Sequence, residues 1–131
     1  MTYALPALTT LIALLFYFVV TLNVARAHAR YGVVVPAMTG HPDFERVYRV
    51  QMNTLEHFAL FLPSLWLFAI FVSPAWASLF GAIWIVGRIL YAIGYYQAAE
   101  KRNAGFLISL AGTAALWLGA SYGVVRVLLQ G

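Results

Sequence analysis

The sequence predicts an all-α integral membrane protein, a single domain of four transmembrane helices packed in an up-down bundle. Of its 131 residues, 63% are hydrophobic and only 9% are charged, whereas soluble domains carry about 25% charged residues. The length fits four spans of roughly 20 to 25 residues with short connections. Turn-forming residues at 32–42, 73–74 and 103–105 divide the apolar runs, which sets the number of helices at four.

The first helix is predicted at about residues 3–31. Residues 1–25 contain no charged side chain, and the stretch lacks the positively charged start and the cleavage site of a signal peptide. We therefore expect a membrane span. Asn23, Arg26 and Arg30 follow at i, i+3 and i+7, so a polar stripe marks the end of this helix where it leaves the hydrocarbon.

The second helix is predicted at about residues 43–72, with Asp43 as its N-cap and Glu45 in its first turn. A helix of about 30 residues is about 45 Å long, which exceeds the roughly 30 Å hydrocarbon core. Its first turns should therefore stand in the headgroup region or be covered by protein. Pro63 is read as a kink of the kind that membrane helices tolerate.

The third and fourth helices are predicted at about residues 75–102 and 105–127. One face of the third helix carries polar and aromatic side chains at steps of four, three, four and seven residues, namely Trp84, Arg88, Tyr91, Tyr95 and Arg102. The fourth carries small residues that suit close helix packing, namely Gly112, Ala115, Gly119 and Gly123.

A polar ladder enters the second span. Arg46, Arg49, Asn53 and Glu56 recur at steps of three, four and three, so they project from one side of a helix within roughly 80°. An intramembrane charge costs about 2.5–3.5 kcal/mol to insert and is a candidate for function. Two interpretations stand at this point: Glu56 pairs with Arg88 or Arg49 as a structural strut, or the group binds a ligand.

The mixture of side chains favours the ligand. Arginine forks match carboxylates, Glu56 matches an ammonium group and Asn53 matches an amide. Together they suit a small zwitterionic ligand with more than one carboxylate. Arg102 at the rim could hold a reactive anion, because a thiolate beside a fixed guanidinium becomes a nucleophile at neutral pH. The tyrosine hydroxyls could do the same, although tyrosines on a membrane helix are also ordinary interfacial residues.

The remaining composition excludes several classes of site. The basic residues are spread singly, so the net charge of +4 does not indicate nucleic acid. There is no cysteine, and His28, His41 and His57 show no ligand spacing, so no metal is expected. Most basic residues belong to one side of the bundle. By the positive-inside rule that side faces the cytosol, and the polar ladders open toward it.

Two segments carry a resemblance to a known family, FERVYRVQMNTLEHFALFLPSLWLF at 44–68 and GRILYAIGYYQAAEKRNAGF at 87–106. In order and spacing they resemble MAPEG, the membrane-associated proteins of eicosanoid and glutathione metabolism. The similarity is greatest to the branch of microsomal glutathione transferase 2 and leukotriene C synthase, and it runs from Arg26 to about Gly112.

The resemblance implies a four-helix protomer that forms a homotrimer, with glutathione bound between neighbouring subunits near the cytosolic side. Matching positions for glutathione are Arg49, Asn53, Glu56, Tyr91 and Tyr95, with Gln51 reaching the site from the adjacent subunit. Arg102 matches the arginine that stabilises the glutathione thiolate, with Tyr95 near the sulfur, and Arg88 matches a buried structural arginine.

The sequence departs from the branch at three positions. His28 stands where a helix-one arginine usually contacts the tripeptide, and Arg26 or Arg30 are candidates to replace it, although they project in other directions. Ala29 stands where the leukotriene synthase has a second arginine, which counts against epoxide opening by that route. His57 replaces an aromatic residue beside the carboxylate and is kept as a glutathione contact.

The function expected from the residues and the resemblance is a membrane glutathione transferase. It would conjugate glutathione to hydrophobic electrophiles that enter from the lipid, and would also reduce lipid hydroperoxides. Two alternatives remain: a non-catalytic lipid-binding member like the lipoxygenase-activating protein, and an unrelated four-helix bundle that moves protons or ions through Glu56 and Arg88.

Overall fold

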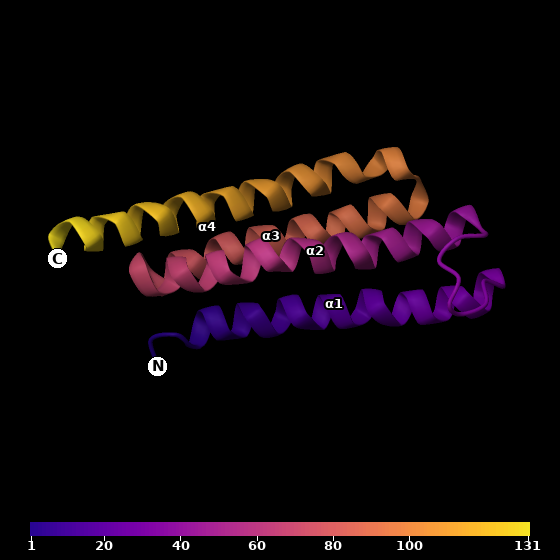
Figure 1. Ribbon diagram of the computed structural model, residues 1–131, viewed down its shortest axis with the longest axis horizontal. Coiled ribbons are helices and arrows are strands. Elements are labelled where there is room, and N and C mark those ends of the chain that lie inside the picture. The colour runs from indigo at the N-terminus through magenta and orange to yellow at the C-terminus, as the bar shows by residue number, and fades with distance from the viewer.

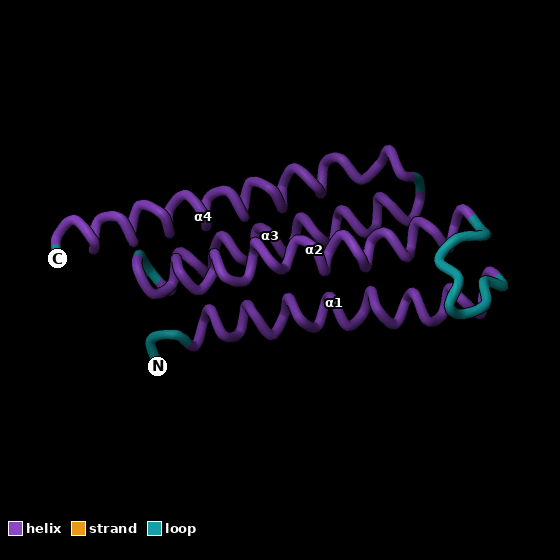
Figure 2. The backbone as a smooth tube through the Cα atoms, viewed as in Figure 1, coloured by secondary structure: helices purple, strands orange, loops and turns teal.

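The structure is a computed structural model that describes residues 1–131. Four long helices follow one another up and down, α1 (Ala4–Tyr31), α2 (Pro42–Phe71), α3 (Pro74–Gln97) and α4 (Asn103–Gln130), with one 3-10 helix, η1 (Ala99–Arg102), before the last (Figure 1). The rest is short loops (Figure 2). Each of the four is long and apolar enough to cross a membrane, so the predicted all-α, four-span architecture is confirmed.

The start of α2 differs from the prediction in its cap. His41, not Asp43, is the N-cap, and its ring Nδ1 accepts a hydrogen bond from the Asp43 N–H at 3.1 Å. Pro42 then takes the first helical position, where its missing N–H costs nothing. The Asp43 carboxylate is instead paired with Arg46 one turn later. The first turn of α2 is therefore held by two local interactions, the His41 cap and the Asp43–Arg46 ion pair.

The third helix ends at Gln97, earlier than the predicted 102. Ala98 takes an extended conformation with φ −165° and ψ 144°, and the chain turns through η1 directly into α4. The turn lies tightly on α3, because a Cβ atom added at Gly94 would stand 2.2 Å from the Lys101 carbonyl oxygen. Arg102 is thus on the turn and not on the α3 face. α4 also runs on to Gln130, beyond the predicted 127.

The helices α2 and α3 form the centre of the bundle. α1 packs against both of them on one side and α4 packs against both on the other (Figure 1). The main core lies between them, where the rings of Phe61 and Trp84 stack with centroids 3.9 Å apart, beside the fully buried Leu65 and Leu116. Outward-facing apolar side chains are numerous on α1 and α4, as expected for surfaces in contact with lipid.

The closest helix pair is α3 and α4. A Cβ atom at Gly105 would lie 2.1 Å from the Tyr91 backbone nitrogen, and one at Gly87 would lie 2.4 Å from the Ser109 nitrogen. Glycine is therefore required at both positions for the backbones to approach. Further along α4, Gly112 faces α3 at Trp84 in the same way, which agrees with the packing role predicted for the small residues of this helix.

The two ends of the bundle differ in charge. Both termini lie at one end, while the α1–α2 loop, the start of α2 and η1 lie at the other (Figure 1). We call the latter the polar end. Six of the eight basic residues of the chain belong to it, namely Arg26, Arg30, Arg46, Arg49, Lys101 and Arg102.

Candidate functional site

A chain of polar contacts links α2 to α3 below the polar end. An Nη2 N–H of Arg49 donates to the Asn53 side-chain oxygen at 2.7 Å, and the Asn53 amide donates to the Tyr91 hydroxyl at 2.5 Å. Arg49 and Asn53 are one turn apart on α2, and Tyr91 is buried on α3. Three residues of the predicted ladders thus form one connected group across two helices.

Glu56 continues this group along α2. Its carboxylate lies 3.9 Å from an Arg49 nitrogen, and the two side chains are 60% and 49% exposed. Both charges therefore stand on the outer surface of the protomer. Of the two pairings predicted for Glu56, the structure shows the one with Arg49, which lies within α2, and no ion pair with Arg88 joins α2 to α3. Because lipid does not solvate charged groups, charged side chains this exposed on a membrane helix must be shielded from the hydrocarbon.

Arg102 reaches the same region from η1. A guanidinium N–H donates to the Ala99 carbonyl at 2.6 Å, and the guanidinium carbon lies 5.7 Å from the centre of the Tyr95 ring. Tyr95 in turn meets Tyr91 edge to face at 5.5 Å. The turn therefore places Arg102 beside the tyrosines of α3. The sequence predicted the same neighbours for Arg102, but on a continuous helix and not on a turn.

Two hollows border these residues. One has a volume of about 310 Å3 and is lined by Asn53, His57, Tyr91, Arg102, Asn103 and Phe106. The other, of about 320 Å3, is lined by Pro42, Glu45, Arg46, Arg49, Tyr95 and Ala99. We call the residues Arg49, Asn53, Glu56, Tyr91, Tyr95 and Arg102 the cradle. Asn53, Tyr91 and Arg102 line the first hollow, and Arg49 and Tyr95 line the second. Glu56 lines neither and lies beside Arg49 on the surface of α2.

Asn103 and Phe106 were not anticipated from the sequence. They come from the first turn of α4, which the tight η1 turn folds back over α3. His57 meets Phe106 edge to face at 6.0 Å and lines the same hollow as Asn53. The segment 103–105 predicts a turn, but its residues do not indicate the direction of that turn.

Arg88 lies behind the cradle and is fully buried. None of its three guanidinium nitrogens has a hydrogen-bond partner, and the guanidinium carbon stands 4.1 Å from the centre of the Tyr91 ring. A cation over an aromatic face is attracted by the ring quadrupole. Arg88 therefore supports Tyr91 from the interior and contributes a positive charge beneath the cradle.

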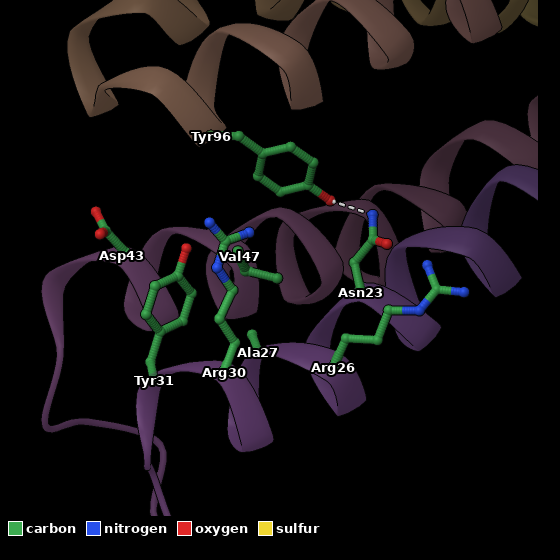
Figure 3. Close-up of a pocket in the computed structure, with 8 residues that line it drawn as sticks. All are labelled: Asn23, Arg26, Ala27, Arg30, Tyr31, Asp43, Val47 and Tyr96. Carbon is green, nitrogen blue, oxygen red and sulfur yellow. Dashed lines mark hydrogen bonds between the residues drawn. The ribbon is translucent and has the colours of Figure 1, made fainter.

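Three other candidates lie apart from the cradle within the chain. The Gln51 amide donates to the Thr21 hydroxyl on α1 at 3.3 Å. The His28 ring is hydrogen-bonded to the Val33 carbonyl at 2.7 Å and packs on Phe44. Arg30 lines a different pocket, between α1, α2 and the end of α3 (Figure 3). None of the three contacts a cradle residue.

The cradle offers two guanidinium groups, one carboxylate, one amide and two phenols within a short stretch of the polar end. Such a set recognises a small ligand that carries carboxylates and an ammonium group. It also provides a fixed cation beside a phenol, where an anionic nucleophile is stabilised. No cluster of three His, Asp or Glu side chains suited to a metal ion is found in the chain.

Known proteins are similar to this chain over most of its length. The MAPEG family model matches residues 6–122. An uncharacterised protein of Synechocystis sp. is 54% identical over 125 residues, which cover 95% of this chain and 91% of that protein. Human microsomal glutathione S-transferase 2 is 40% identical over 109 residues, 83% of this chain and 74% of that protein. Leukotriene C4 synthase of Cavia porcellus is 39% identical over 115 residues, 88% and 75% respectively.

The family model covers most of the chain, and four of the chain's helices are long and apolar enough to cross a membrane. The predicted resemblance to the microsomal glutathione transferase 2 and leukotriene C synthase branch is confirmed by two of these relatives. The chain is therefore a multi-pass membrane protein that belongs to the MAPEG family.

Proposed function

We propose that the protein is a membrane glutathione transferase that activates glutathione as its thiolate and conjugates it to hydrophobic electrophiles. The observation that carries the proposal is the meeting of Arg102 and Tyr95 beside the connected Arg49–Asn53–Tyr91 group. The names of the relatives, a glutathione S-transferase and a leukotriene C4 synthase, point to the same chemistry.

Glutathione fits the charges of the cradle group by group. It has two carboxylates, one ammonium group and two peptide bonds. In the proposed complex Arg49 binds a carboxylate, Glu56 binds the ammonium group, and the Asn53 side chain and the Tyr91 hydroxyl bind peptide groups. His57 contacts the tripeptide from the adjoining turn of α2. The existing Arg49–Glu56 pair is 3.9 Å apart and exposed, so exchanging it for ligand contacts is inexpensive.

Arg102 and Tyr95 are the proposed catalytic residues. The guanidinium stabilises the sulfur anion and the Tyr95 hydroxyl donates to it, so the thiol loses its proton to solvent before attack. The thiolate then forms a carbon–sulfur bond with the electrophile and expels the leaving group. In the peroxidase side activity the same thiolate would attack the terminal oxygen of a lipid hydroperoxide, which breaks the O–O bond and releases the lipid alcohol. A second glutathione would then reduce the glutathione sulfenic acid to glutathione disulfide and water.

A homotrimer is part of the proposal. Arg49 and Glu56 are about half exposed on the surface of a membrane helix, so a neighbouring protomer is a suitable cover. Gln51 projects from the other side of α2 and would reach the site of the adjacent subunit after leaving Thr21. The apolar substrate would enter from lipid between α1 and α4 of neighbouring protomers.

The proposed orientation puts the cradle on the cytosolic side, because six basic residues lie at the polar end and Arg126 lies at the other. The chain has no cysteine, so a single cysteine placed at the exposed Met38 reports the side of that end. An impermeant maleimide should not label this cysteine in intact cells. Labelling of the cysteine would show that the polar end faces away from the cytosol.

Replacement of Arg102 tests the function. Arg102→Ala should lower the rate of conjugation with 1-chloro-2,4-dinitrobenzene by roughly 100-fold, as loss of one anion-stabilising group does elsewhere. Lys101→Ala is the matched control, because Lys101 is the adjacent exposed cation and bonds only to Gln97. If both variants are folded and turn over substrate at the same rate, Arg102 takes no part in catalysis.

A further inference from the structure

The largest pocket of the chain lies outside the cradle. It has a volume of about 570 Å3 and is bounded by the end of α1, the start of α2 and the end of α3. Figure 3 shows Arg30 projecting from α1 toward Tyr96, which reaches over from α3, and Arg26 on the far side of Asn23 with its guanidinium directed away from Arg30. The Asn23 amide donates to the Tyr96 hydroxyl at 3.1 Å and closes one side.

The pocket is cationic. Arg26 and Arg30 are exposed and belong to neither of the two ion pairs of the chain; the Arg30 guanidinium carbon lies 5.4 Å from the centre of the Tyr31 ring. The only acidic side chain in the lining is Asp43, and its carboxylate is taken by Arg46. Two guanidinium groups are therefore free for an anion, and guanidinium groups match phosphate oxygens well.

An apolar groove continues from this pocket along α1 and α3. It has a volume of about 380 Å3, and ten of its eleven lining residues are hydrophobic. Asn23 and Tyr96 line both spaces, so the hydrogen-bonded pair stands at their junction. On α1 the groove spans Ile12 to Asn23, and several of its side chains, such as Leu15 and Val19, are exposed.

The two spaces follow one another in the order of the parts of a membrane lipid, a polar space next to an apolar one. The apolar run Leu5–Leu22 on α1 is 18 residues and so about 27 Å long, close to the hydrocarbon thickness. Asn23, Arg26 and Arg30 follow it, which puts the guanidinium groups at the level of the headgroups. The groove then lies at the level of an acyl chain, directly below them.

We propose that this surface between α1 and α3 binds an anionic phospholipid, with its phosphate on Arg26 and Arg30 and one acyl chain in the groove. The Asn23–Tyr96 pair lies where the glycerol region of the lipid would be. The site shares no residue with the cradle. Arg30 and Arg26 also project about 160° away from His28 around α1, so the site does not depend on the proposed glutathione chemistry.

Native mass spectrometry of the full chain in detergent tests the proposal, with dioleoylphosphatidylglycerol and dioleoylphosphatidylcholine as probes. The wild type should bind phosphatidylglycerol more tightly. The double variant Arg26→Gln/Arg30→Gln should lose about fivefold in affinity for each arginine, roughly 25-fold in total. The double variant Lys101→Gln/Arg126→Gln removes the same number of charges elsewhere and should bind as the wild type does.

A second variant tests the acyl-chain part of the site. Val19→Trp keeps both arginines, fills the groove at an exposed position and should weaken phosphatidylglycerol binding without unfolding the chain. Glycerol 3-phosphate, the headgroup alone, should not displace the lipid. The proposal is overturned if the control variant loses affinity equally, if Val19→Trp has no effect, if glycerol 3-phosphate competes as well as lipid, or if the arginine variant loses glutathione binding and keeps lipid.

Discussion

At the residue scale, the cradle depends on one short polar relay. Asn53 accepts from Arg49 and donates to Tyr91, and Tyr91 is itself held by the buried Arg88 on its other face. Each member is therefore oriented before a ligand arrives, and pre-orientation lowers the entropy lost on binding. The side chains that would contact glutathione thus hold one another in place, and Arg88 supports Tyr91 from the interior.

Removing the acceptor of this relay should weaken glutathione binding more than chemistry. Tyr91→Phe leaves the ring on Arg88 but removes the hydroxyl that receives the Asn53 amide. The net loss of one hydrogen bond is about 0.5–1.5 kcal/mol, so KM for glutathione should rise about two- to tenfold while kcat changes little. Steady-state kinetics with varied glutathione measure this.

Tyr122→Phe is the control for that variant, because Tyr122 is an exposed tyrosine toward the far end of α4. An unchanged KM in Tyr91→Phe would mean that Asn53 and Tyr91 orient nothing that touches glutathione. Such a result would leave the relay as a purely structural contact between α2 and α3.

At the element scale, the cradle is placed by the junction of α3, η1 and α4. The lengths of the spans and their up-down order follow from hydropathy and from the turn residues between them, so the sequence predicts them well. The end of α3 does not follow in this way. Helical spacing in the sequence puts Tyr95 and Arg102 on one face of a continuous helix. In the structure α3 ends before Arg102, and the turn that carries Lys101 packs against Gly94.

The same limit applies to the site. The ladder on α2 is visible in the sequence because its steps follow the helical period. Contacts between helices, such as Phe106 with His57 and Asn23 with Tyr96, depend on the rotation of each helix about its axis. That rotation is set by which small residues let two backbones meet, and a single sequence does not specify those pairs.

The α3–α4 contact gives a stability prediction. A Cβ atom at Gly105 would stand 2.1 Å from the Tyr91 nitrogen, whereas one at Gly112 would meet its nearest atom, the Phe80 oxygen, at 3.0 Å. Both glycines face backbone atoms of α3, so the shorter approach at Gly105 requires the larger shift, and overpacking typically costs about 1–3 kcal/mol. Gly105→Ala should therefore lower the unfolding temperature in detergent more than Gly112→Ala does.

Gly105→Ala should also weaken glutathione binding, because it displaces α4 from Tyr91, while Gly112→Ala lies further from the cradle. The order of the two unfolding temperatures is the decisive quantity. If Gly112→Ala is the more destabilised variant, the close approach of α4 to Tyr91 is not the contact that holds this junction together.

At the scale of the whole molecule, the exposed charges of the cradle are the basis for proposing that neighbouring subunits complete the site. Mixing two inactive variants tests whether neighbouring subunits complete it. Arg102→Ala and Gln51→Ala trimers, each inactive or impaired, are dissociated, mixed in equal amounts and reassembled. If Gln51 acts from the adjacent subunit, about one quarter of the sites in random trimers carry both intact residues.

Conjugation activity should then recover toward that fraction of the wild-type rate. A mixture no more active than the average of its two components would place Gln51 and Arg102 in the same subunit's site, or Gln51 in no site. A sedimentation mass other than three protomers for the wild type would contradict the trimer before any mixing is done.

The measurement closest to the central claim is the ultraviolet absorbance of the glutathione thiolate, followed by stopped flow on mixing with the protein. The account predicts a prompt absorbance rise at neutral pH in the wild type and in Lys101→Ala, and no rise in Arg102→Ala, because only Arg102 stabilises the sulfur anion. A full thiolate signal in Arg102→Ala, or none in the wild type at saturating glutathione, would contradict it.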